Sequence, residues 1–127
     1  FVLSTASWVH AEDEDEGAAA PASRYIEITP AFVTNFGGPG RLRYIKVEVT
    51  LRVTGGEGEE QVRHHLPHIK DTLLNLFAIQ TPESIGSAEG KEQLRQVALE
   101  EVSHMLSEED TDSYIEDLLF TSFVAHQ

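Results

Sequence analysis

Residues 43–53 constrain the fold of this chain more than any other segment. Polar and apolar side chains alternate along the whole segment. Successive side chains of a strand point to opposite faces of a sheet, so this period of two predicts a strand with one buried and one hydrated face. Such strands are typical of antiparallel sheets. The residues expected on the buried face are Ile45, Val47, Val49, Leu51 and Val53.

The segments on either side of this strand predict a second strand and several helices. Residues 25–29 alternate in the same way, and Phe32 extends that strand beyond a break at Pro30. Apolar residues at helical spacing follow at 62–77, where Pro67 is expected to kink or restart the helix. Two further helices are expected to begin at caps formed by Thr81 and Ser87.

Residues 115–125 are apolar on both sides, which predicts a central strand. We expect this strand to pair with residues 43–53 and so to close the domain. The predicted fold class is therefore α+β: a small antiparallel sheet with helices packed on one face, in the order β-β-α-α-α-β.

The amino end has a different composition. Residues 1–11 are mildly apolar but too few for a membrane helix, which needs roughly 20 apolar residues. They fit the end of a signal peptide, with Val9-His10-Ala11 as the cleavage site, or the end of a membrane helix. Both interpretations imply export. Residues 12–23 hold an acidic run and no large apolar side chain, which predicts a flexible linker before a folded domain at 24–127.

The overall charge and the missing cysteines exclude several functions. The net charge is −13, so the surface repels phosphate backbones and binding to nucleic acid is not expected. The chain contains no cysteine, which excludes disulfides, thiolate nucleophiles and zinc sites built from cysteine.

Motifs for catalysis or metal binding are weak. His64 and His68 are four residues apart, a spacing at which two imidazoles on one helix can share a metal, but no third ligand follows at a fixed spacing. The glycine-rich segments 37–40 and 55–58 predict turns, and the second lacks the Lys and Ser/Thr of a phosphate-binding loop. We therefore expect no enzymatic activity, no cofactor and no bound metal.

The distribution of charge suggests self-association. The candidate oligomer contacts are the basic residues Arg41, Arg43, Lys46 and Arg52 and the acidic residues Glu108 and Glu109. One alternative is pairing within a subunit, with Lys46 or Arg52 opposite Glu116 or Asp117. The other is a head-to-tail contact between subunits, which closes into a ring when the rotation fits. Exposed ion pairs would set the register of such a contact rather than its strength.

Several short segments occur in an order and spacing that is typical of a known family. They are Tyr25; Pro30, Phe32, Val33 and Asn35; Tyr44-Ile45-Lys46-Val47; Pro67, Ile69 and Asp71; Ser87 with Glu89-Gly90-Lys91; and Phe120-Thr121-Ser122-Phe123-Val124. Together they cover about residues 25–127 and resemble the FliL family of flagellar proteins. No single segment is diagnostic, because each consists mostly of apolar patterning.

This resemblance implies a stomatin-like (SPFH-type) fold and a non-enzymatic role in the periplasm beside the flagellar motor. It implies a ring-like homo-oligomer around or beside the stator units that supports torque generation, and hence motility and chemotaxis. The expected partners are the chain itself, the stator proteins and the basal body, with the inner membrane reached only through the amino-terminal segment. A soluble periplasmic SPFH-like scaffold with a non-flagellar partner is the alternative.

Overall fold

The computed structural model describes residues 22–37, 39–40, 43–109 and 114–126. The proposed leader, residues 1–11, and nearly all of the proposed linker at 12–23 lie outside these residues. The elements follow the chain as β1 (Ser23–Asn35), β2 (Tyr44–Thr54), α1 (Gly55–His64), α2 (Leu66–Ala78), α3 (Pro82–Ile85), α4 (Ala88–Glu108) and β3 (Ile115–His126). The predicted α+β class is confirmed.

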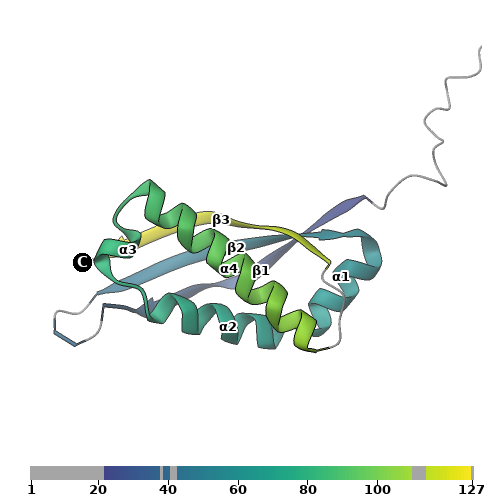
Figure 1. Cartoon of the computed structure of the whole chain (residues 1–127), viewed down its shortest axis with the longest axis horizontal. Coiled ribbons are helices and arrows are strands. Elements are labelled where there is room, and N and C mark those ends of the chain that lie inside the picture. The colour runs from purple at the N-terminus through teal and green to yellow at the C-terminus, as the bar shows by residue number, and fades with distance from the viewer. Residues whose placement is uncertain (1–21, 38, 41–42, 110–113, 127) are drawn as a thin grey trace, which may run out of the picture.

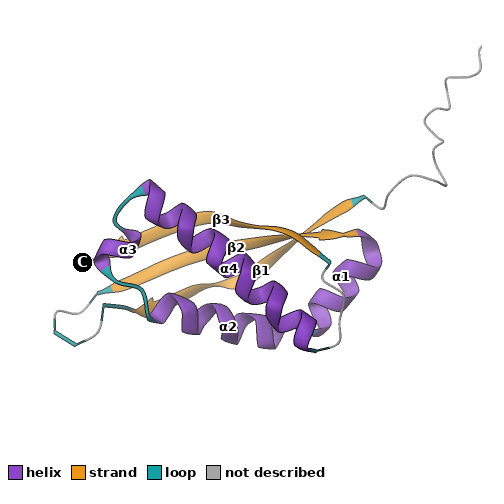
Figure 2. Ribbon diagram, viewed as in Figure 1, coloured by secondary structure: helices purple, strands orange, loops and turns teal. Residues whose placement is uncertain are grey.

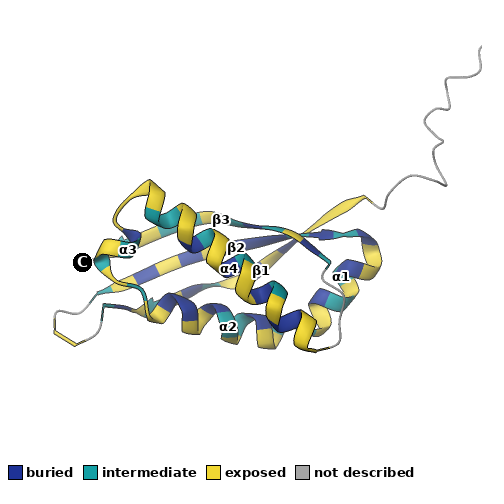
Figure 3. Cartoon of the chain, viewed as in Figure 1, coloured by how far each residue is buried: buried dark blue, intermediate teal, exposed yellow. Residues whose placement is uncertain are grey.

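Within the described residues, the sheet has three antiparallel strands in the order β1-β2-β3 (Figure 1). The expected pairing of the strand at 43–53 with the last strand is confirmed. The first strand also continues past Pro30 as expected, with a shift of register between Ile28 and Phe32. Each inward-pointing residue of β2 from Ile45 to Val53 is fully buried, as the period of two predicts (Figure 3).

The prediction that residues 115–125 form a central strand is wrong, because β2 is central and β3 lies at an edge of the described sheet. The reason is an irregularity in the pairing of β2 with β3. Glu48 pairs with Ser122 and the next residue, Val49, pairs with Phe120, so Thr121 is an extra residue in β3. Such a bulge places Phe120 and Phe123 on the same face although they are three residues apart. The segment therefore looks apolar on both sides when strict alternation is assumed.

The helices of the described residues cover the apolar face of the sheet, with α2 and α4 in front of it and α1 at one end (Figures 1 and 2). The expected helix at 62–77 is two helices, α1 and α2, which meet at His65, and Pro67 lies in the first turn of α2. Pro fits there because the first backbone N–H groups of a helix have no partner within it. The structure therefore has one helix more than predicted.

The predicted turn at residues 55–58 is also wrong, because α1 begins at Gly55 and includes all of this segment. Gly58 is buried against Tyr114, where a Cβ atom would lie 2.9 Å from the Tyr114 Cβ. A glycine here therefore permits close packing of α1 against the chain that enters β3.

The two predicted helix caps are confirmed. The Thr81 side chain accepts a hydrogen bond from the Ser84 backbone N–H at the start of α3, and Ser87 accepts one from the Gly90 N–H at the start of α4. These bonds satisfy backbone donors that have no partner inside the helix.

Candidate interaction surfaces

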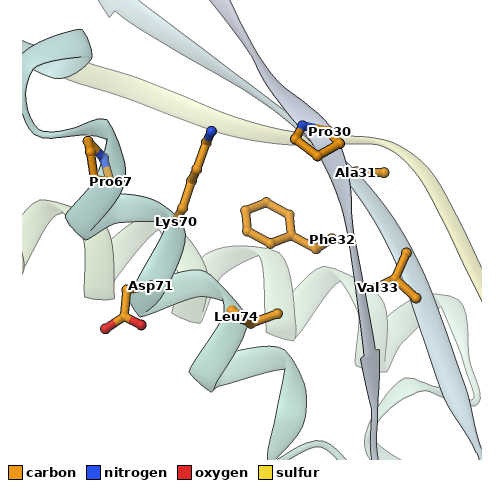
Figure 4. Close-up of a pocket in the computed structure, with 8 residues that line it drawn as sticks. All are labelled: Pro30, Ala31, Phe32, Val33, Pro67, Lys70, Asp71 and Leu74. Atoms are coloured by element: carbon orange, nitrogen blue, oxygen red, sulfur yellow. The ribbon is translucent and has the colours of Figure 1, made fainter.

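The first candidate surface is a groove at the β1 edge of the sheet, between β1 and α2 (Figure 4). We call it the β1 groove; it has a volume of about 410 Å3. Its lining is mainly apolar, with Val33 59% and Leu74 38% exposed. The lining residues are Pro30, Ala31, Phe32, Val33, Pro67, Lys70, Asp71 and Leu74.

The two charged residues of the β1 groove differ in their surroundings. The Lys70 Nζ atom donates a hydrogen bond to the Thr29 backbone oxygen at 3.0 Å, which fixes α2 to β1. The Asp71 carboxylate makes no ion pair with any described residue. It is exposed at the rim of the groove, where a cation from outside the domain can reach it.

The second candidate surface lies at the opposite edge, between β3 and α4. We call it the β3 groove; it has a volume of about 350 Å3. The Nζ atom of Lys91 lies 5.2 Å from the centroid of the Phe123 ring, a cation–π contact. The lining residues are Ala88, Lys91, Glu92, Arg95, Leu119, Phe120 and Phe123.

A row of aromatic rings connects the two grooves through the core. Phe32 of the β1 groove contacts Phe77 with a centroid distance of 5.4 Å, and Phe77 contacts Phe120 at 5.9 Å. Phe120 then contacts Phe123 at 5.5 Å, and both rings line the β3 groove. Phe77 itself is fully buried. The grooves are therefore the two open ends of one apolar layer between the sheet and the helices.

Arg95 joins α4 to β3 beside the β3 groove. Its Nη1 atom bonds to Asp117 Oδ1 at 2.7 Å and to the Leu118 backbone oxygen at 3.0 Å, while its Nη2 atom lies 2.6 Å from Glu92 Oε2. The hydrogen bond from Arg95, supported by one from Gln96, lowers the pKa of Glu92 to about 2. The same bond to Glu92, followed by that to Asp117, raises the pKa of Arg95 above its usual range.

Replacing Arg95 with methionine is expected to make unfolding less sensitive to acid. Glu92 has a lower pKa in the folded chain than its usual 4.5, so it stabilises the fold above pH 4.5 and this contribution is lost as the pH falls towards 2. Without Arg95 the main cause of the lowered Glu92 pKa is gone, so protonation of Glu92 in acid should cost the folded chain little stability. The midpoint of denaturant unfolding, measured from pH 7 down to pH 2, tests this. The control is Lys46→Met, which removes an exposed cation that has no ion pair among the described residues. Its unfolding midpoint should fall with decreasing pH as steeply as that of the parent chain.

The predicted basic contacts do not form one patch in the structure. Arg41 lies outside the described residues. Arg43 is half-buried beside Gly37, and its Nε atom has no hydrogen-bond partner among the described residues. Lys46 is exposed near the start of β2, whereas Arg52, six residues further on, is roughly 20 Å away along the strand.

Arg52 forms the pair within the chain that was one of the two alternatives. Its Nε atom donates to Glu116 Oε1 at 3.0 Å. The Glu116 carboxylate also accepts from Ser23 Oγ at 2.7 Å and from Thr54 Oγ1 at 2.8 Å. These hydrogen bonds, those from Ser23 and Thr54 first, hold the pKa of Glu116 below its usual range. Glu116 thus connects the beginning of β1, the end of β2 and the beginning of β3.

The predicted acidic contacts lie at the end of α4 and face histidines. Glu109 Oε2 is 3.2 Å from His68 Nδ1, and Glu108 Oε2 is 3.7 Å from His104 Nε2. His64 and His68, weighed as metal ligands, lie on different helices, so helical spacing does not bring them together. The described residues contain no group of three or more His, Asp or Glu side chains placed to hold a metal ion.

Sequence reasoning missed both grooves because their apolar residues were assigned to the core. The segments that carry the resemblance to a known family nevertheless meet there in pairs. Residues 30–33 line the β1 groove together with Pro67 and Asp71, and Lys91 lines the β3 groove together with Phe120 and Phe123. These segments are therefore a signal for the grooves in the sequence, but they can be recognised as such only when the fold shows which segments lie side by side.

Exposed apolar grooves such as these two mark candidate sites of contact with another molecule. The model of the family described as flagellar basal body-associated protein FliL matches residues 25–125. The chain belongs to this FliL family. None of the helices in the described part of the chain is long and apolar enough to cross a membrane.

Individual relatives agree with this assignment. The flagellar protein FliL of Aquifex aeolicus is 28% identical over 98 residues, which are 77% of this chain and 58% of that protein. The flagellar protein FliL of Escherichia coli K12 is 26% identical over 116 residues, which are 91% of this chain and 73% of that protein. The flagellar protein FliL of Shigella flexneri gives the same identity and coverage. The chain thus spans less than two thirds of the Aquifex relative.

Proposed function

We propose that this chain is a non-enzymatic accessory protein of the flagellar motor that works in the periplasm. In this proposal it forms a ring-like oligomer around or beside the stator units and supports torque generation. Membership of a family of flagellar basal body-associated proteins carries the proposal. We also propose that the domain has the stomatin-like (SPFH-type) fold that the family resemblance implies.

The described surface supports a role in protein contact. Both grooves have largely apolar linings, and most of the polar groups beside them are already engaged within the chain: Lys70 with Thr29, and Arg95 with Glu92 and Asp117. A catalytic site needs ionisable groups that converge on free space. Exposed apolar grooves at the edges of a sheet can instead receive the apolar side chains of another protein.

Deleting the gene in its own organism is expected to reduce swimming, and supplying the chain should restore it. Rotation of single motors under load would show lower torque or fewer engaged stator units in the deletion strain. Cross-linking in cells, followed by identification of the attached proteins, should recover stator components.

Two results would contradict this proposal. Normal torque in the deletion strain would remove the motor function. Attachment only to non-flagellar periplasmic proteins would instead favour a scaffold with another partner. A strain complemented with the Glu101→Lys variant provides a control for expression, because Glu101 is exposed and lies outside both grooves.

A further inference from the structure

The two grooves lie at the same level along the strands, on opposite edges of the described sheet. Phe32 of β1 pairs with Val47 of β2, and Val47 pairs with Phe123 of β3, so these residues form one row across the sheet. Phe32 lines the β1 groove and Phe123 the β3 groove. A second copy placed beside the first, with its strands in the same directions, therefore brings its β3 groove to the β1 groove of the first.

The charges at the two grooves are complementary. The β1 groove carries the exposed Asp71 carboxylate, which has no ion pair among the described residues. The β3 groove carries the Lys91 ammonium group, which contacts the face of Phe123 and makes no ion pair with a described carboxylate. At the β1 groove the Lys70 ammonium group is held by the Thr29 carbonyl oxygen, and at the β3 groove Arg95 is paired with Glu92 and Asp117. The charged groups of the two linings that have no ion-pair or hydrogen-bond partner among the described residues are therefore Asp71 and Lys91, which are opposite in sign. Opposite charges on facing surfaces favour one register and disfavour others.

The β1 edge does not favour extension of the sheet by a further strand at this level. Pro30 has no backbone N–H, and the Thr29 carbonyl oxygen already accepts a hydrogen bond from Lys70. A contact here must therefore be made by side chains, mainly the exposed Val33 and Leu74. The β3 groove of the neighbouring copy offers apolar side chains against which Val33 and Leu74 can pack. These are the half-buried Leu119, Phe120 and Phe123.

We propose that the β1 groove of one copy packs against the β3 groove of a second copy, with Asp71 beside Lys91 of the neighbouring copy. The contact joins two different surfaces, so every added copy leaves one groove open at each end and the contact can repeat. It closes into a ring when the rotation between copies fits. This inference rests on the oligomer in the proposed function and assigns it to apolar grooves, in place of the charged residues predicted from the sequence.

Reversing the charges one at a time tests the proposal. Asp71→Lys and Lys91→Asp are each expected to weaken self-association of the full chain by at least roughly tenfold, because like charges then face each other. The double variant should restore it. Sedimentation velocity over a range of concentrations measures the effect. Glu101→Lys, which makes the same charge change on an exposed residue outside both grooves, is the matched control and should change little.

Engineered cysteines give an independent test, since the chain has none of its own. Leu74→Cys with Ala88→Cys places one thiol at each groove, and mild oxidation should give a ladder of covalent multimers. The control pairs Leu74→Cys with Val97→Cys, whose residue is 40% exposed but lies outside both grooves. It should give no ladder beyond dimers.

The outcomes separate this interface from the flagellar role. If neither charge reversal changed self-association and the groove cysteines gave no ladder, the proposed interface would be disproved, whereas the proposed motor function would not be affected. Restored association in the double variant and a ladder from the groove pair alone would support the interface even if the deletion strain swam normally.

Discussion

Replacing Phe77 with alanine is expected to lower the free energy of unfolding by about 3–5 kcal/mol. Phe77 is fully buried, and its ring contacts those of Phe32 and Phe120. The substitution removes these contacts and leaves a cavity between the sheet and α2. Natural domains have total stabilities of about 5–15 kcal/mol, so this loss is a large part of the whole. The loss of free energy can be measured as a lower midpoint of denaturant unfolding, and the dependence of that free energy on denaturant concentration should stay unchanged.

A nearby exposed position is the control for this prediction. Ile79, two residues further along, is 74% exposed and ends α2 as its C-cap. Ile79→Ala should change the free energy of unfolding by no more than about 0.5 kcal/mol. A similar small effect for Phe77→Ala would mean that the aromatic row is not part of the stable core.

Gly90→Ala is expected to destabilise the domain by about 2 kcal/mol although alanine favours helices. A Cβ atom at Gly90 would clash with the carbonyl oxygen of Ser84 and lie 3.0 Å from its carbonyl carbon. These are backbone atoms at the end of α3, which cannot turn aside as a side chain can. The clash should outweigh the roughly 1 kcal/mol that alanine otherwise gains over glycine in a helix.

Gly56→Ala is the matched control, because it makes the same change in the first turn of α1. A Cβ atom there would lie 3.6 Å or more from the end of the flexible Arg24 side chain, an ordinary contact. The variant should therefore match the parent chain or gain up to about 1 kcal/mol. If Gly90→Ala proved as stable as Gly56→Ala, the close approach of α3 and α4 would be disproved. Both variants can be compared by denaturant unfolding under identical conditions.

Where one physical rule acts alone, the sequence predicts the fold well. β2 lies within one residue of the predicted bounds because its alternation is strict and only one face is buried. The caps at Thr81 and Ser87 were predictable because a short polar side chain before a helical pattern has a local partner, the N–H three residues later.

Where distant residues decide the structure, the sequence was misleading. The extra residue Thr121 in β3 depends on how β3 pairs with β2, and no local pattern reveals it. The role of Gly58 depends on Tyr114, which is far away in the chain. Glycine-rich segments are usually turns, so a helix that begins with glycines for close packing was not expected.

The candidate surfaces were the hardest part to predict. Charge along the chain led to Arg52 and Glu109, yet the structure pairs Arg52 with Glu116 and Glu109 with His68 inside the chain. Phe120 and Phe123 looked like ordinary core residues, because their lining of a groove depends on β3 lying at an edge of the sheet. Whether the predicted charged residues also contact another subunit stays a prediction.

The way β1 begins has a mechanical consequence. Ser23 is bonded to Glu116 and pairs with Thr54, and from there β1 runs antiparallel to β2 as far as Asn35. Hydrogen bonds between antiparallel strands lie across the strand direction. A pull on the chain ahead of Ser23, directed along β1, therefore loads these bonds in shear and all together, rather than opening them one after another. The domain should therefore withstand a force applied at this point far better than a force that peels a strand from its end.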